Sequence, residues 1–215
     1  MTRRQSVWAL VFGVLLLASP FTPWAQAQDI TDAASKMLAA ASPLGDRILG
    51  KPDAPIVMVA YTSATCPHCA EFHEKVLPQI KAEYIDTGKV RFIFREFPLD
   101  QVALAAFMLA RCVPEDKYFA TNDLMFRRQG TWTKGDKPAE LLTITQMAGM
   151  DRAGFDACLK RDDLAKAIFE SSKKAAKDFA IKGTPAIFIN GQMIDGHKEM
   201  TEVKAAIDAA IKKSP

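Results

Sequence analysis

The feature that most constrains the fold of this chain is a strand–helix–strand pattern that runs from residue 56 to residue 97. Residues 56–61 (IVMVAY) are a continuous apolar run rich in β-branched side chains, which predicts a buried central strand. From Pro67 the apolar residues recur with helical period, and Pro78 predicts a kink in that helix. Residues 90–97 (VRFIFREF) predict a second strand. A strand, a helix and a strand in this order form a βαβ unit with parallel strands.

A long helical stretch separates this unit from the remaining strands. Residues 99–182 contain no convincing strand pattern, and helices are expected at 102–110, 117–126, 140–148 and 164–180. Residues 186–189 (AIFI) then predict a short buried strand. Asn190-Gly191 is typical of a type I′ turn, so residues 192–194 should return as an antiparallel edge strand. An amphipathic helix over 199–212 should cover the sheet.

The N-terminus has the pattern of an export signal. Arg3-Arg4 precede an apolar run over residues 7–18, and Ala25-Gln26-Ala27 offers a small-residue cleavage site. The apolar run is too short for a helix to cross a hydrocarbon layer of about 30 Å. Residues 1–27 are therefore expected to be a cleaved signal peptide, with an uncleaved anchor as the alternative. The general secretory route and twin-arginine export both stay open.

The mature chain, residues 28–215, is expected to be one domain, with a sheet-forming core at about 46–98 and 181–215 and a helical insertion at about 99–180. The whole sequence has 28 basic and 25 acidic residues, and a net charge of +3 does not indicate a nucleic-acid-binding protein. Four cysteines are too few for a disulfide-stapled miniprotein. In an oxidising compartment, each of them needs its own explanation.

Cys66-Pro67-His68-Cys69 stands at the start of the helix that follows the first strand. Two cysteines at this spacing close a small disulfide that reopens by exchange with another thiol. Cys66 is expected to be the exposed, attacking thiol, because unpaired N–H groups and the helix dipole favour its thiolate. His68 adds a donor or a positive charge. Cys69, one turn further on and less exposed, is expected to be the resolving thiol.

Other interpretations of this motif find less support in the sequence. Covalent haem attachment needs a histidine directly after the second cysteine, where this chain has Ala70. A zinc site needs two more ligands, and Cys112 and Cys158 are isolated, so no metal site is expected. A purely structural bridge between neighbouring cysteines would stabilise the fold little, because its loop is short.

With these residues in place, the sequence resembles the thioredoxin superfamily and, within it, the DsbA-type thiol:disulfide oxidoreductases of the bacterial periplasm. The resemblance covers nearly all of the mature chain. It is carried by the Cys66–Cys69 motif after a strand, the helical insertion, and Gly183-Thr184-Pro185 before the closing strands and helix. Pro-His between the cysteines is typical of DsbA-type oxidases, whereas thioredoxins typically have Gly-Pro. The implied fold is α/β, a thioredoxin fold with an inserted helical subdomain.

The resemblance also implies roles for individual residues. Pro185 should be cis and face the cysteine pair, and Pro67, Thr184 and Pro185 should bind an extended substrate peptide. The alternative is that Thr184-Pro185 is only a turn before a strand. The sequence departs from the superfamily at Ala60, where a buried acid often helps to remove the proton of the resolving thiol.

The implied function is to introduce disulfide bonds into reduced exported proteins in the periplasm. The protein should be monomeric, need no bound cofactor, and be reoxidised by a quinone-linked membrane partner. A disulfide isomerase or reductase remains an alternative within the same chemistry, partly because Thr184 also precedes the proline in isomerases. A non-redox periplasmic binding protein or holdase is the alternative from another class.

Cys112 and Cys158, both in the insertion, are expected to form a structural disulfide, as in some relatives of this subfamily. Two buried free thiols are the alternative. His73 is expected to be a surface or half-buried helix residue, and residues 132–137 (WTKGDK) are expected to be an exposed loop.

Overall fold

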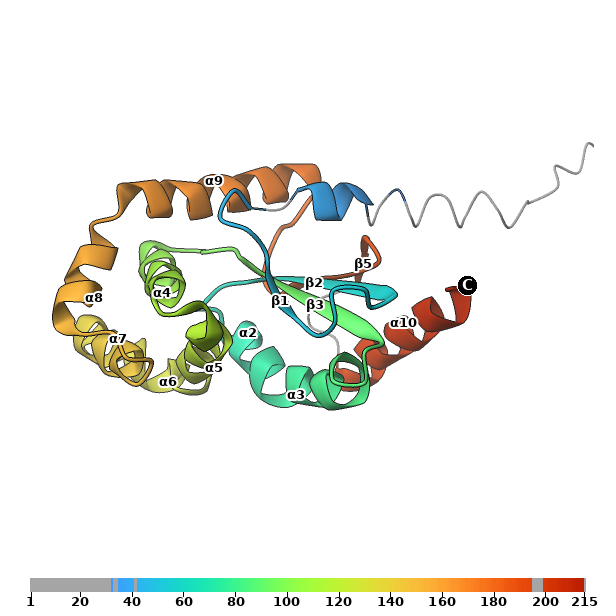
Figure 1. Ribbon diagram of the computed structural model, residues 1–215, viewed down its shortest axis with the longest axis horizontal. Coiled ribbons are helices and arrows are strands. Elements are labelled where there is room, and N and C mark those ends of the chain that lie inside the picture. Colours follow the sequence, from blue (N-terminus) through green and yellow to red (C-terminus); the bar gives the residue numbers. More distant parts are fainter. Residues whose placement is uncertain (1–31, 33–34, 41, 195–198, 215) are drawn as a thin grey trace, which may run out of the picture.

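The computed structural model describes residues 32, 35–40, 42–194 and 199–214, so the expected signal peptide (1–27) lies outside the described residues. Its centre is a five-stranded sheet in the order β1-β3-β2-β4-β5 (Figure 1). The strands are β1 (Arg47–Leu49), β2 (Ile56–Thr62), β3 (Val90–Glu96), β4 (Ala186–Ile189) and β5 (Gln192–Ile194). Strands β2 and β3 are parallel, as the βαβ pattern predicts, and the other neighbours are antiparallel.

The helix between β2 and β3 is interrupted by two π-helical turns. Its pieces are α2 (Pro67–Glu71), η1 (Phe72–Val76), α3 (Leu77–Ile80) and η2 (Lys81–Ile85). The Leu77 N–H donates to the carbonyl of Phe72, five residues back. Pro78 follows in the first turn of α3, where a missing backbone N–H breaks no helical hydrogen bond.

The segment between β3 and β4 is helical throughout. It contains α4 (Gln101–Cys112), η3 (Glu115–Lys117), α5 (Tyr118–Arg127), α6 (Gln129–Trp132), α7 (Lys137–Gln146), α8 (Arg152–Leu159) and α9 (Asp162–Asp178). Asp100, Asp136 and Asp151 cap α4, α7 and α8 by accepting a backbone N–H in the first turn. A helical insertion in a thioredoxin-type sheet is therefore present, as expected from the sequence.

Side chains of β2 alternate between two apolar cores, one on each face of the sheet. Met58 and Ala60 point into the larger core, which the helix between β2 and β3, α10 (Met200–Lys213) and the insertion cover. Val59 and Tyr61 point into a smaller core, which contains Ala175 of α9. Figure 1 shows α9 above the sheet, α3 and α10 below it, and α4–α8 to one side.

The structure differs from the sequence analysis in four single features. The sequence patterns missed β1, α6 and α8. Trp132, expected in an exposed loop, is fully buried, and its indole N–H donates to the carbonyl of Met125 at 2.7 Å. The expected exposed loop therefore begins only after this residue.

A buried ion pair joins the insertion to the sheet. Arg111 of α4 contacts Glu96 at the end of β3, and both side chains are 4% exposed. The Tyr118 hydroxyl donates to the same carboxylate at 2.6 Å. Cys112, the next residue along α4, is joined to Cys158 of α8 by a disulfide.

Among the described residues, no helix combines the length and hydrophobicity that a membrane span requires.

Candidate active site

Cys66 lies where the loop after β2 turns into α2. It is the N-cap residue of the helix, with extended backbone, and its carbonyl accepts the N–H groups of Cys69 at 3.1 Å and Ala70 at 3.2 Å. Pro67 occupies the first helical position, where its fixed φ suits the helix and its missing N–H leaves no donor unpaired. The motif thereby places the Cys66 sulfur beside free N–H groups at the start of the helix.

The two thiols are both free, and their environments differ. Cys69 is completely buried, whereas Cys66 is 8% exposed, so Cys66 is the accessible one of the pair although most of it is covered. The pKa of Cys66 is lowered to about 5, and the largest cause is a hydrogen bond from the Cys69 thiol. Burial opposes this change, whereas the Thr184 side chain and the N–H groups of Cys69 and His68 contribute to it. Burial raises the pKa of Cys69, and the neighbouring Cys66 raises it again.

Thr184 and Pro185, the two residues before β4, face the cysteine pair. Their peptide bond is cis, and the Cys66 thiol donates to the Thr184 carbonyl at 3.2 Å. The Thr184 hydroxyl is buried and has no hydrogen-bond partner. It is therefore available to donate to Cys66 once that sulfur is ionised.

The remaining members of the motif lie at the surface. The side chains of Pro67 and His68 are exposed beside the more accessible sulfur. Six of the eight sequence-predicted residues, Pro67 and His68 with the two cysteines, Thr184 and Pro185, thus gather in one place, while the Cys112–Cys158 bridge lies in the insertion. Within the described part of the chain, no group of three His, Cys, Asp or Glu side chains is placed to hold a metal ion.

Two side chains near the cysteines, those of Gln129 and Asp100, were not predicted from the sequence to belong to the site. The Gln129 side-chain amide, from α6, donates to the carbonyls of Ala64 at 2.8 Å and Cys66 at 2.9 Å. It therefore ties the loop before the active-site helix to the insertion. Asp100 accepts a hydrogen bond from the hydroxyl of Thr65, the residue before Cys66, at 2.7 Å.

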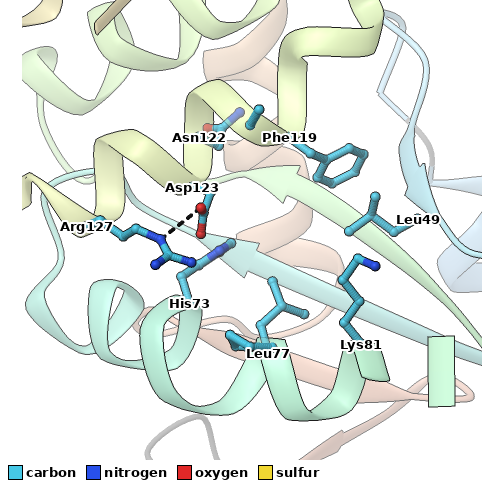
Figure 2. A pocket seen from close by; sticks show the side chains of 10 residues that line it. Leu49, His73, Leu77, Lys81, Phe119, Asn122, Asp123 and Arg127 are labelled. Atoms are coloured by element: carbon cyan, nitrogen blue, oxygen red, sulfur yellow. Dashed lines mark hydrogen bonds and ion pairs between the residues drawn. The ribbon is translucent and has the colours of Figure 1, made fainter. Parts of the chain in front are cut away.

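His73, two turns after Cys66, is buried rather than half-exposed. It is 4% exposed and stacks on Phe126 of α5, with ring centroids 3.9 Å apart. Burial lowers the pKa of His73 to about 3, so the ring is neutral. It forms one wall of a cavity of about 260 Å³ between the active-site helix and α5. Figure 2 shows His73 with Leu77 and Lys81 on one side of this cavity and Asn122, Asp123 and Phe119 on the other.

A dithiol at the start of a helix, facing a cis-proline where β2 ends and β4 begins, defines a thioredoxin-fold dithiol protein. The model of the Thioredoxin family matches residues 42–209. The crystal structure of Wolbachia pipientis α-DsbA1 superposes with a TM-score of 0.73 at 34% identity, covering 78% of this chain and 92% of that one. This chain therefore belongs to the thioredoxin family, in its DsbA-type group, which confirms the resemblance inferred from the sequence.

Two curated relatives extend the comparison. A Rickettsia bellii protein, provisionally named a protein-disulfide oxidoreductase, is 35% identical over 171 residues, which are 79% of this chain and 66% of that protein. The Bacillus subtilis protein named disulfide bond formation protein D is 27% identical over 180 residues, 78% of each chain. The chain thus spans just under two thirds of the length of the Rickettsia relative.

Proposed function

We propose that this chain is a thiol:disulfide oxidoreductase that introduces disulfide bonds into exported proteins by exchange through a Cys66–Cys69 disulfide. The observation that carries the proposal is the difference between the two thiols. The pKa of Cys66 is lowered from 9.0 to about 5, and at pH 7 the resulting ionisation of this thiol favours the reduced form by ~3 kcal/mol. For a two-electron couple this amounts to roughly 60 mV. A disulfide whose reduced form is stabilised in this way is a strong oxidant.

The geometry supports an exchange that begins at Cys66. A substrate thiolate attacks the Cys66 sulfur, the S–S bond breaks, and Cys69 leaves with the electron pair. The substrate's second thiolate then attacks its own sulfur in the mixed disulfide and releases Cys66. Because the pKa of Cys66 is low, its thiolate is a good leaving group. The protein ends with two thiols, and the substrate has gained a disulfide.

Four neighbouring residues have supporting roles in this proposal. Thr184 and Pro185 bind an extended substrate segment next to Cys66, where the Thr184 carbonyl already accepts a hydrogen bond from the thiol. Pro67 and His68 form the exposed rim that the substrate meets. His68 also contributes through its backbone N–H, which lowers the pKa of Cys66. The Cys112–Cys158 bridge is structural.

The cellular setting is part of the proposal. Residues 1–27 act as a cleaved signal peptide, and the mature domain, 28–215, works in the periplasm as a monomer. Its core is 46–98 with 181–215, and 99–180 form the insertion. The names of the relatives and the low pKa of Cys66 support a donor of disulfides. Such a donor needs no bound cofactor, but it requires a quinone-linked membrane partner to restore its own disulfide.

The experiment that tests the direction of exchange is an equilibrium titration in graded glutathione buffers. The purified mature protein is alkylated after equilibration, and the free thiols of Cys66 and Cys69 are counted by mass. We expect half-reduction in a strongly oxidising buffer, near the range of known disulfide donors. If the pair stays oxidised until the buffer is strongly reducing, the oxidase function is wrong and a reductase takes its place. Full biological activity of a Cys66→Ser variant would instead indicate a non-redox binding protein.

A further inference from the structure

The cavity of about 260 Å³ beside the helix between β2 and β3 has no part in the exchange proposed above, and neither Cys66 nor Cys69 lines it. We call it the His73 cavity. Its buried floor consists of His73 and Leu77 of that helix and Asn122 of α5. Exposed side chains surround its mouth, namely those of Pro78, Lys81, Ala120 and Arg127. The cavity is therefore open to solvent above a buried floor (Figure 2).

Two residues of the floor carry a buried polar atom that lacks a hydrogen-bond partner. These atoms are Nε2 of His73 and Oδ1 of Asn122. The two side chains are 4% and 1% exposed. The side-chain N–H of Asn122 donates to the carbonyl of Tyr118 at 2.9 Å, which leaves its oxygen unpaired. Because buried polar atoms in folded proteins are nearly always paired, two unpaired atoms on one cavity floor indicate a hydrogen-bonding molecule that enters the cavity.

One wall of the cavity comes from the irregular part of the helix between β2 and β3. His73 belongs to the π-helical turn η1 and Lys81 to η2, with Leu77 and Pro78 of α3 between them. Turns of π-helix are rare and are found frequently at functional sites. The cavity therefore coincides with a local feature of this helix that ordinary helix packing does not require.

The charged side chains at the mouth already have partners. Lys81 contacts Asp86 at 2.6 Å, and Arg127 contacts Asp123 at 2.9 Å. Burial lowers the pKa of His73 to about 3, so the floor is uncharged at neutral pH. An ion in the cavity would lose its hydration without gaining an unpaired charge of opposite sign. The cavity therefore suits an uncharged ligand.

The unpaired atoms and the volume define this ligand further. Oδ1 of Asn122 accepts hydrogen bonds only, whereas Nε2 of the neutral His73 ring donates in one tautomer and accepts in the other. A hydroxyl group both donates and accepts, so it can pair with either atom. A cavity of about 150 Å³ holds benzene. A volume of about 260 Å³, with walls that include Leu49 and Phe119, therefore suits an apolar body of about two fused rings.

We propose that the His73 cavity binds a small uncharged molecule with an apolar body of about two fused rings and a hydroxyl group that pairs with His73 or Asn122 on the floor. The rings pack against Leu77 and Phe119, and the hydroxyl supplies a hydrogen bond that the fold leaves unmade. The site does not include the cysteine pair or the residues before β4. The proposal is therefore independent of the direction of disulfide exchange.

The test uses three probes that share one bicyclic body, namely 5-indanol, indane and indane-5-carboxylate. Each is titrated into the purified mature protein, and binding is followed by the backbone amide chemical shifts. We expect 5-indanol to move the signals of residues 73–81 and 119–127. It should bind about 2- to 10-fold more tightly than indane, which is the contribution of one net hydrogen bond between uncharged groups. The carboxylate should bind more weakly than 5-indanol by about tenfold or more, because its charge is buried without a partner.

Single replacements assign the contacts. Ala120→Phe places a ring in the mouth and should weaken the binding of 5-indanol by about tenfold or more. Ala139→Phe is the matched control and should bind as the wild type does, because Ala139 is also the exposed third residue of a helix, α7, but does not line the cavity. The preference for 5-indanol over indane should disappear in His73→Phe or in Asn122→Leu, depending on which atom the hydroxyl meets. Indane should still bind to both variants, which shows that they are folded.

Several results would overturn the proposal. Indane may not equal 5-indanol in affinity, indane-5-carboxylate may not exceed it, and the two floor variants may not both keep the preference. Signals that move only beside Cys66 and Pro185 would also refute the proposal, because the ligand would then occupy the peptide site. If no probe moves the signals of residues 73–81, the cavity holds water alone and the assignment of a ligand site is wrong.

Discussion

Replacing His73 by phenylalanine is expected to make the fold more resistant to acid than the wild type. The His73 ring stacks on Phe126 and meets Phe72 and Phe94 edge-on, so a phenyl ring preserves these contacts. Nε2 of His73 is buried and has no hydrogen-bond partner, so the replacement breaks no hydrogen bond at that atom. Removal of an unsatisfied buried polar group should by itself stabilise the fold by about 1–3 kcal/mol at neutral pH.

The magnitude in acid follows from the pKa of His73. Burial lowers it from 6.5 to about 3 in the folded protein. Below pH 6.5 the unfolded chain therefore binds a proton that the folded protein does not bind, and stability falls as the pH falls. The loss is about 1.4 kcal/mol per pH unit until the pH approaches 3. At pH 4.5 this one proton costs the wild type roughly 3 kcal/mol, and the phenylalanine variant avoids that cost.

Urea unfolding at pH 7.5, 5.5 and 4.5, followed by the fluorescence of buried Trp132, measures this difference. Both proteins are kept in the same redox state. The difference in the free energy of unfolding between variant and wild type should be constant above pH 6.5 and grow steadily below it. Equal pH dependence in the two proteins would show that His73 titrates normally, and the assignment of a neutral buried ring would then be wrong.

Further predictions concern the cysteines and their contacts. Thr184→Val should raise the pKa of Cys66, because it removes a hydroxyl that lowers this pKa, whereas Thr184→Ser should keep the pKa low. The pKa of Cys66 in each variant is measured from the thiolate absorbance near 240 nm as a function of pH. Gln129→Met should remove the side-chain donor of the Ala64 carbonyl, while the Cys66 carbonyl keeps the N–H groups of Cys69 and Ala70, and it should lower the free energy of unfolding in urea by about 1–3 kcal/mol. Replacing Cys112 and Cys158 by alanine should reduce stability by up to ~4 kcal/mol on the chain-entropy model, because the bridge spans 46 residues, and it should leave the pKa of Cys66 unchanged.

The parts of the fold that local pattern determines could be predicted from the sequence. The apolar runs of β2 and β4 and the helical period after Pro67 each depend on neighbouring residues alone. Asn190-Gly191 indicated a turn with positive φ at both positions, and the structure has φ values of 47° and 79° there. The Asn190 side chain also accepts the N–H of Val57 of β2 at 2.8 Å, a contact across 133 residues that no local pattern reveals.

The parts that the sequence did not predict depend on contacts between distant segments. Strand β1 is only three residues long and exists because it pairs with β3. His73 is buried because α5 packs against the active-site helix and brings Phe126 onto its ring. Gln129 and Asp100 contribute through side-chain hydrogen bonds to residues 64–66, and such contacts have no periodicity. The motif therefore indicated where the two free thiols lie together, while the groups that surround them required the structure.

The contact between Cys66 and Thr184 joins two segments that the ribosome synthesises at different times. The two residues are 118 positions apart. At ribosomal rates of about 5–20 residues per second, roughly 6–24 s separate the synthesis of one from that of the other. Cys112 and Cys158 are made within this interval, while the Cys66 thiol still lacks its partner on β4. The hydrogen bond between the Cys66 thiol and the Thr184 carbonyl can therefore form only after the chain's other two cysteines have been made, so the cis-proline side of the site is the last part of it to be synthesised.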